Sequence, residues 1–145
     1  MPEIVLNPLA IVVAIVVAFF VGFIWFTVLF GRSWAVEMGF DPDMQPEKSE
    51  MFRGMALNVL GNVFLVWVFA HNIAVWNPET WGAGAQTLSP LAYAAMAAFF
   101  TWLGFFVPVQ LSAVAWERRS WKLFAINGAY HFLTLLLVAL ILVLL

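Results

Sequence analysis

The sequence predicts an all-α integral membrane protein, a four-helix bundle built from two similar helical hairpins. Hydrophobic residues make up 65% of the 145 residues and charged residues only 10%, whereas a soluble domain is about half apolar and about a quarter charged. Four stretches without a charged side chain are each long enough to cross a bilayer as a helix. Two parts of the chain, residues 7–73 and 89–144, also share a spacing of residues that suggests a repeat.

The charge-free stretches locate the membrane helices. They cover residues 4–31, 54–78, 81–116 and 123–145. A membrane-spanning segment must satisfy its own backbone hydrogen bonds, so each stretch is expected to be helical. We therefore predict one transmembrane domain over residues 1–145, with helices near 8–30, 51–73, 90–115 and 121–144.

Capping residues indicate where these helices begin. Asn7-Pro8 and Ser89-Pro90 each place a capping side chain before a proline, which is favoured at the first helical position. Ser49 is expected to cap the second helix. The first segment lacks the basic start, the short apolar core and the cleavage site of a signal peptide, so it is expected to be a retained helix.

The basic residues predict the orientation in the membrane. All six lie near the first and third connections: Arg32, Lys48, Arg53, Arg118, Arg119 and Lys122. Lys and Arg close to helix ends stay on the cytoplasmic side. The sequence therefore predicts a bacterial inner-membrane protein with both termini outside and with loops 31–50 and 116–121 in the cytoplasm.

The two predicted hairpins resemble each other in detail. Residues 7–10 (Asn-Pro-Leu-Ala) correspond to residues 89–92 (Ser-Pro-Leu-Ala), and Arg53, Asn58 and Asn62 have the spacing of Lys122, Asn127 and His131. Both copies run from outside to inside and back, which predicts a parallel repeat about an axis along the membrane normal. The alternative is chance similarity between apolar segments.

Five polar side chains are predicted to form one layer in the inner half of the bilayer: Asn58, Asn62, Gln110, Asn127 and His131. Two explanations remain open. Amides and imidazoles commonly hydrogen-bond across membrane helices and fix their packing, and polar residues at this depth also mark cavities, proton relays and ligand sites. His131 is the member of the layer whose charge can change near neutral pH. Pro108 is expected to kink the third helix beside Gln110.

The sequence contains no recognisable catalytic or cofactor motif. Without cysteine there is no disulfide, thiolate nucleophile or cysteine metal site. A catalytic serine set, a zinc-protease motif and a phosphate-binding loop are also missing. The chain lacks the basic surface that nucleic-acid binding requires. We therefore predict no enzyme activity, cofactor, metal or nucleic-acid partner.

Several motifs resemble a known family. They are Asn7-Pro8, Gly22 with Trp25, Gly31-Arg32-Ser33-Trp34, Met38-Gly39, and the stretch from Trp121-Lys122-Leu123-Phe124 to Ile126-Asn127 and Tyr130-His131. With these motifs the chain is similar, over nearly its whole length, to the small bacterial membrane proteins catalogued as domain of unknown function 1761. The resemblance implies a four-helix membrane protein in which Asn127 and His131 belong to the characteristic motif, and it implies no activity.

Three functions follow as hypotheses. The first is a small transporter or channel that uses the polar layer for a solute or ion. The second is a non-catalytic scaffold or interaction protein in which the layer only fixes helix packing. The third, least favoured, is a membrane-embedded enzyme. Besides lipid, the expected partner is a second copy of the chain, most simply in a dimer, because a bundle this small has little interior of its own.

Overall fold

The computed structural model describes residues 4–85 and 87–145. The chain is 81% helix, which confirms the all-α fold class. Within the described residues, four helical segments are long and apolar enough to cross a membrane: Pro8–Leu29, Lys48–Trp76, Pro90–Trp116 and Trp121–Leu144. The two-hairpin repeat stays a prediction.

Two of the four spans change helix type along their length. The elements in chain order are α1 (Pro8–Phe23), the π-helix η1 (Ile24–Leu29), α2 (Gly31–Met38), α3 (Lys48–Trp76), the 3₁₀ turn η2 (Pro78–Trp81), α4 (Pro90–Thr101), the π-helix η3 (Trp102–Phe106), α5 (Val107–Trp116) and α6 (Trp121–Leu144). The first span thus contains a π-helical segment at its carboxyl end and the third span contains one near its middle.

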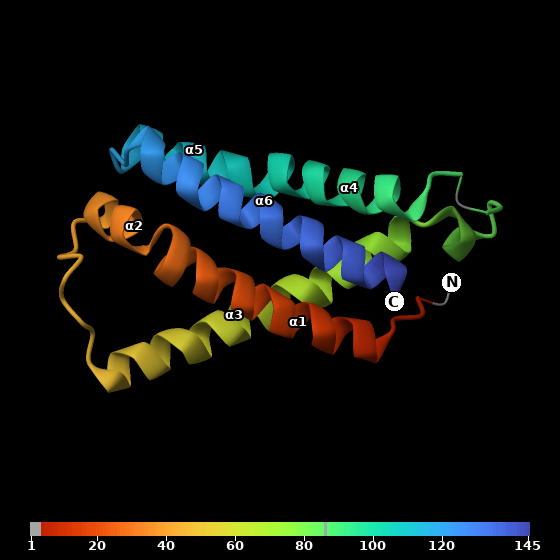
Figure 1. Cartoon of the computed structure of the whole chain (residues 1–145). Coiled ribbons are helices and arrows are strands. Elements are labelled where there is room, and N and C mark those ends of the chain that lie inside the picture. Colours follow the sequence, from red (N-terminus) through yellow and green to blue (C-terminus); the bar gives the residue numbers. More distant parts are fainter. Residues whose placement is uncertain (1–3, 86) are drawn as a thin grey trace.

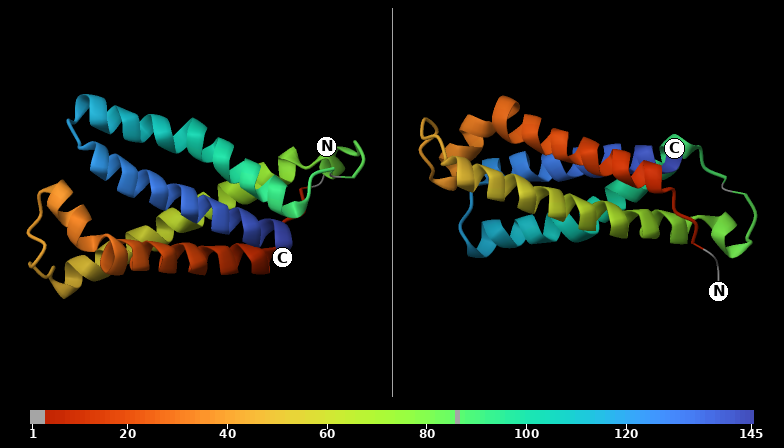
Figure 2. Two further views of the ribbon diagram at one scale, coloured as in Figure 1. Left: turned by 45° about the horizontal axis from the view of Figure 1, so that its top comes forward. Right: turned by 90° about the horizontal axis from the view of Figure 1, so that it is seen from below.

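Helix α6 is the centre of the fold, since it packs against α1, α3, α4 and α5. The molecule has two distinct ends (Figures 1 and 2). One end holds α2 and the α5–α6 turn; all six basic residues lie toward it, and we call it the basic end. The other end holds Asn7, the carboxyl terminus and the α3–α4 connection, and we call it the terminal end.

The hydrophobic core lies in the half of the bundle toward the terminal end. Its buried members are Ile11, Ala14, Ala18, Val66, Phe69, Ala70, Ile73, Ala94, Ala98, Leu135, Val138 and Ala139. Alanines supply almost half of this cluster. Small side chains let helix backbones approach closely, which is how membrane helices gain van der Waals contact.

The other half of α3 lies outside this core. Residues 48–61, which we call the α3 arm, are exposed except for the half-buried Met55. Figure 1 shows the arm diverging from α5 and α6 toward the basic end. The arm begins with the charged residues Lys48, Glu50 and Arg53, but from residue 54 on it is as free of charge as the segments that pack. The sequence therefore gives no sign of where along the membrane span the helices diverge.

Two of the three predicted helix caps are present. Asn7 accepts hydrogen bonds from the backbone of Leu9 and Ala10, and Ser89 accepts one from Ala92. The prediction for Ser49 is wrong. Helix α3 begins one residue before it, and the Ser49 hydroxyl donates to Glu47 at the cap position.

The first connection is not all loop, because its residues Gly31–Met38 form α2. Gly31 allows the helix to start directly after η1, since a Cβ atom there would lie 2.6 Å from the Phe26 carbonyl oxygen. Gly39 ends α2 in the left-handed conformation, with φ +80°, which glycine adopts without strain.

Candidate functional site

The two predicted amides of α3 contact each other. Asn62 donates from Nδ2 to Asn58 Oδ1 at 3.0 Å, as their separation of one helical turn permits. Asn62 is buried with 6% exposure, whereas Asn58, one turn nearer the basic end, is exposed. The pair therefore marks the boundary between the core and the α3 arm.

Tyr130 connects this pair to the rest of the bundle. Its hydroxyl lies near the side chains of Asn58 and Thr134, and among the described residues the buried Thr134 hydroxyl makes no hydrogen bond. Its ring packs edge-on against Phe26 at 4.8 Å between centroids. The hydroxyl also lies against Gly22, where a Cβ atom would come within 3.0 Å of it. A single buried tyrosine thus joins α1, η1, α3 and α6.

Sequence reasoning did not select Tyr130 as a site residue. It appears only within the Tyr130-His131 motif, and a tyrosine in an apolar segment is usually a packing residue. One feature of the sequence could have identified Tyr130 as a site residue. Tyr130 lies one turn from both Asn127 and Thr134 on α6, so a polar stripe runs along that helix.

Gln110 and Asn127 form a second group. Both line a small pocket of about 160 Å³ near the basic end, which also includes Met38, Glu117 and Arg119. Among the described residues, no hydrogen bond joins this group to the Asn58–Asn62 pair. The five predicted residues therefore lie in two polar groups, with His131 between aromatic rings.

His131 packs against aromatic side chains. Its ring centroid lies 4.6 Å from that of Phe106 and 4.9 Å from that of Tyr130. Within the described part of the chain the imidazole makes no hydrogen bond. The contact with Phe106 comes from the carboxyl end of η3, so the π-helical segment positions the ring that covers this histidine.

Each π-helical segment is fastened to α6 by a tryptophan. Trp25 Nε1 donates to the Ile126 carbonyl at 3.2 Å, and Trp102 Nε1 donates to the Gly128 carbonyl at 2.9 Å. Pro108 was predicted to kink the third span. The structure has η3 immediately before α5, with the Val107 N–H bonded to the Trp102 carbonyl, five residues back. Proline has no N–H to continue an α-helical ladder, which accounts for a break here.

The basic end has its own polar junction. Ser120 caps α6 by accepting from the Leu123 N–H, and its hydroxyl donates to Glu37 Oε2 at 2.5 Å. Lys122 Nζ lies 3.3 Å from Glu37 Oε1. The hydrogen bond from Ser120, followed by the interaction with Lys122, holds the pKa of Glu37 below its ordinary value. This junction ties α2 to the start of α6.

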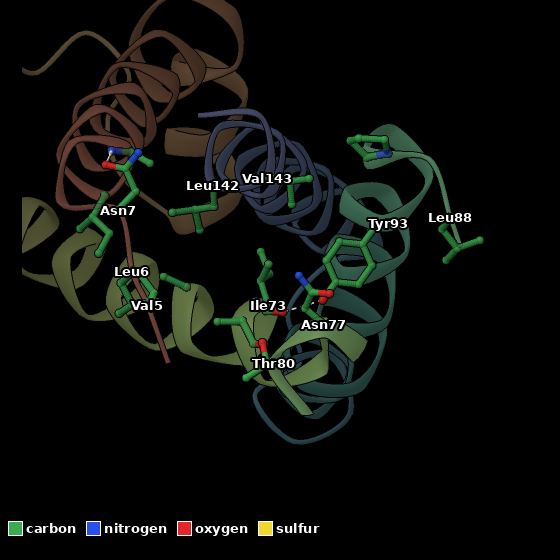
Figure 3. Close-up of a pocket in the computed structure, with 15 residues that line it drawn as sticks. Val5, Leu6, Asn7, Ile73, Asn77, Thr80, Leu88, Tyr93, Leu142 and Val143 are labelled. Carbon is green, nitrogen blue, oxygen red and sulfur yellow. Dashed lines mark hydrogen bonds between the residues drawn. The ribbon is translucent and has the colours of Figure 1, made fainter. Parts of the chain in front are cut away.

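A larger pocket opens at the terminal end (Figure 3). It has a volume of about 380 Å³ and lies between α1, α3, α4 and α6. Asn77 and Thr80 line it beside apolar side chains such as Ile73 and Leu142. The Tyr93 hydroxyl donates to the Ile73 carbonyl at its wall. Core residues Ala70 and Ile11 also line this pocket, which places the core at its inner side.

No cluster of three or more potential metal-binding side chains occurs in residues 4–85 and 87–145. The described polar groups instead form hydrogen bonds and ring contacts between helices.

The family of the chain is shown by sequence comparison. Residues 9–143 match the family described as Protein of unknown function (DUF1761). The chain belongs to this family. The match covers nearly the whole chain, including all four candidate membrane spans, and confirms the resemblance seen in the motifs. The family carries no assigned activity. Neither the curated proteins nor the solved structures include a match.

Proposed function

We propose that this member of the DUF1761 family is a non-catalytic membrane interaction protein. The core anchors the bundle in the bilayer, and the α3 arm engages a transmembrane helix of another polypeptide. In this proposal the basic end faces the cytoplasm of a bacterial cell, because Lys and Arg near helix ends are retained on that side. The termini then lie outside.

The exposure of the α3 arm is the observation that carries the proposal. In the core half of α3, the face formed by Asn62, Val66, Phe69, Ala70 and Ile73 is buried against other helices. The same face continues into the arm and has no such cover there. Because it carries an amide at membrane depth, lipid is an unfavourable neighbour for it. A second helix would supply both packing and hydrogen bonds.

Two tryptophans near the polar layer also support a role in helix packing. Trp25 and Trp102 each use their indole N–H to bind a backbone carbonyl of α6. Hydrogen bonds between membrane helices contribute about 0.6 to 2 kcal/mol each. These two indole hydrogen bonds, made by residues outside the five-residue layer, hold η1 and η3 against α6 without any ligand.

A photo-crosslinking amino acid at Val59 tests this proposal in native membranes. Val59 lies on the α3 arm and is 39% exposed. Val12 on α1, an exposed position of the core half, is the matched control. The expected result is a discrete adduct at position 59 with one membrane protein, identified by mass spectrometry, and lipid adducts at position 12. Lipid adducts alone at position 59 would exclude the proposed interaction.

Transport of a small solute or ion is the second candidate, and the pocket at the terminal end favours it. That pocket and the diverging α3 arm lie at opposite ends of the bundle, with the alanine-rich core between them. A transporter would have to open this core during its cycle.

Flux through liposomes separates the two candidates. Proton and small-solute flux would be compared between wild type and a double variant with Asn127→Ala and His131→Ala. The interaction proposal expects no wild-type flux above protein-free liposomes. Wild-type flux that the double variant loses, at unchanged thermal stability, would establish transport and overturn it.

A further inference from the structure

The side chains on the uncovered face of the α3 arm indicate which kind of partner covers it. Stepping back by helical turns from the buried Asn62 leads to Asn58 and Val59, then to Met55, then to Met51. Met51 is 50% exposed and Met55 half-buried. This face thus presents two methionines and one amide that the other helices of the chain leave largely uncovered.

The amide on this face has unused hydrogen-bonding capacity. Asn58 Oδ1 accepts from Asn62, and the Tyr130 hydroxyl is its other described polar neighbour. A side-chain amide carries two N–H donors and two acceptor lone pairs. Asn58 therefore has capacity left for one more partner that both donates and accepts.

We propose that a second copy of this chain covers the arm, in a parallel dimer about a twofold axis along the membrane normal. The inference rests on the proposed interaction function and names its partner. Each arm packs its uncovered face against that of the other, and Asn58 bonds to Asn58 of the partner subunit. An asparagine side chain is self-complementary in this way, and both copies enter the membrane in the same direction, so the two amides lie at equal depth.

The charges at the start of the arm fit the same arrangement. Glu47 is the cap residue of α3 and Lys48 is its first helical residue. Successive positions are about 100° apart around the helix axis, which puts these two on opposite sides of the face that contains Met51. In a parallel pair related by a twofold axis, the Glu47 side of one helix lies next to the Lys48 side of the other. Each copy thereby sets one carboxylate beside one ammonium group, whereas a partner of unrelated sequence has no reason to match them.

Disulfide crosslinking of single-cysteine variants tests the interface. The chain has no cysteine, so an introduced thiol can only pair with another copy. Met51→Cys lies on the proposed interface, and Leu60→Cys, with a similar exposure of 48%, faces away from it. In liposomes we expect rapid oxidation of the full-length Met51→Cys protein to a covalent dimer and little dimer for Leu60→Cys. Equal crosslinking at both positions would overturn the proposed interface.

Energy transfer between labelled copies in liposomes tests the role of Asn58. We expect Asn58→Ala to weaken self-association by about 3- to 30-fold, the range for one interhelical hydrogen bond. Asn58→Gln keeps the amide and should recover most of the affinity. Asn72→Ala, an exposed asparagine at the far end of α3, is the control. Circular dichroism establishes that each variant is folded, and equal affinity of wild type and Asn58→Ala would refute the amide contact.

The two proposals fail separately. If purified wild type stays monomeric in liposomes while Val59 crosslinks to a different identified protein in native membranes, the dimer is wrong and the interaction function stands. If Val59 crosslinks to lipid alone and the purified protein is monomeric, both are wrong.

Discussion

The two halves of α3 have opposite surroundings, and a valine in each half makes the comparison direct. Val66 in the core half has 0% exposure, whereas Val59 in the arm, two turns earlier, is 39% exposed. The difference comes from the other helices. Ala14, Ala18 and Ala139 leave room for close approach in the core half, while the rings of Tyr130, Phe26 and Trp25 lie between the helices beyond it. Because the residue is a valine at both positions, its burial here follows the size of the neighbouring side chains.

Enlarging a core alanine should have the largest effect. Ala98 on α4 has 0% exposure, so Ala98→Leu forces bulk into a filled space and is expected to destabilise the fold by about 1–3 kcal/mol. The control is Ala95→Leu, an exposed position on the same helix. Thermal unfolding in detergent, followed by circular dichroism, measures both. Equal melting temperatures would show that the core is loosely packed.

Replacing one valine by alanine in each half of α3 compares how much each half contributes to stability. Val66→Ala removes buried methyl groups and is expected to lower the stability by about 1–2 kcal/mol. Val59→Ala removes the same groups from the arm, and in detergent it should be neutral or slightly stabilising because alanine is the better helix former. The same unfolding measurement applies. A loss at Val59 as large as that at Val66 would contradict the uncovered arm.

A methyl group at Gly22 probes the boundary between the halves. Gly22→Ala places a Cβ atom 3.0 Å from the Tyr130 hydroxyl, so the tyrosine must shift, and we expect a loss of about 1 kcal/mol. Gly104→Ala is the control, because nothing lies within 4 Å of the added atom there. A smaller loss for Gly22→Ala when Tyr130→Phe is also present would show that the hydroxyl causes the clash.

The smallest expected effect is a pH dependence at the basic end. The pKa of Glu37 is lowered in the folded state, first by the hydrogen bond from Ser120. Its contribution to stability is therefore complete above the ordinary carboxyl pKa and is lost as the pH falls through the lowered value. Glu37→Gln should lose less stability than wild type over that acidic window. Thermal unfolding as a function of pH checks this, with the exposed Glu50→Gln as control.

Much of the fold could be predicted from the sequence because the bilayer dictates it. Charge-free stretches of sufficient length define the spans, and Asn7 and Ser89 show where two of them begin. Helix α2 was missed because it has only eight residues, carries Arg32 and Glu37 in a predicted polar loop, and begins without a side-chain cap. Ser49 was misplaced as a cap because Glu47 follows Pro46 and already starts the helix.

The candidate site was predicted in part. The polar residues were identified by type, since an amide in an apolar helix stands out. Their grouping was not, because spacing along one helix does not fix how helices rotate or diverge relative to each other. Gln110 and Asn127 share a pocket, and Asn58 and Asn62 share a hydrogen bond, but Tyr130, which joins α3 to α6, is an ordinary residue in the sequence.

The π-helical segments η1 and η3 determine how the residues that follow them are rotated about the helix axis. A π turn holds one residue more than an α turn, and one residue corresponds to about 100° of rotation. Deleting a single residue from η3 would therefore let the span run as a continuous α-helix while α5 keeps nearly the same orientation. If all five residues of η3 instead adopted α-helical geometry, α5 would turn about its own axis by roughly that angle, and Gln110 would face away from Asn127. The extra residue between Trp102 and Phe106 thus decides which side of the span up to Trp116 faces α6, with no change in hydropathy.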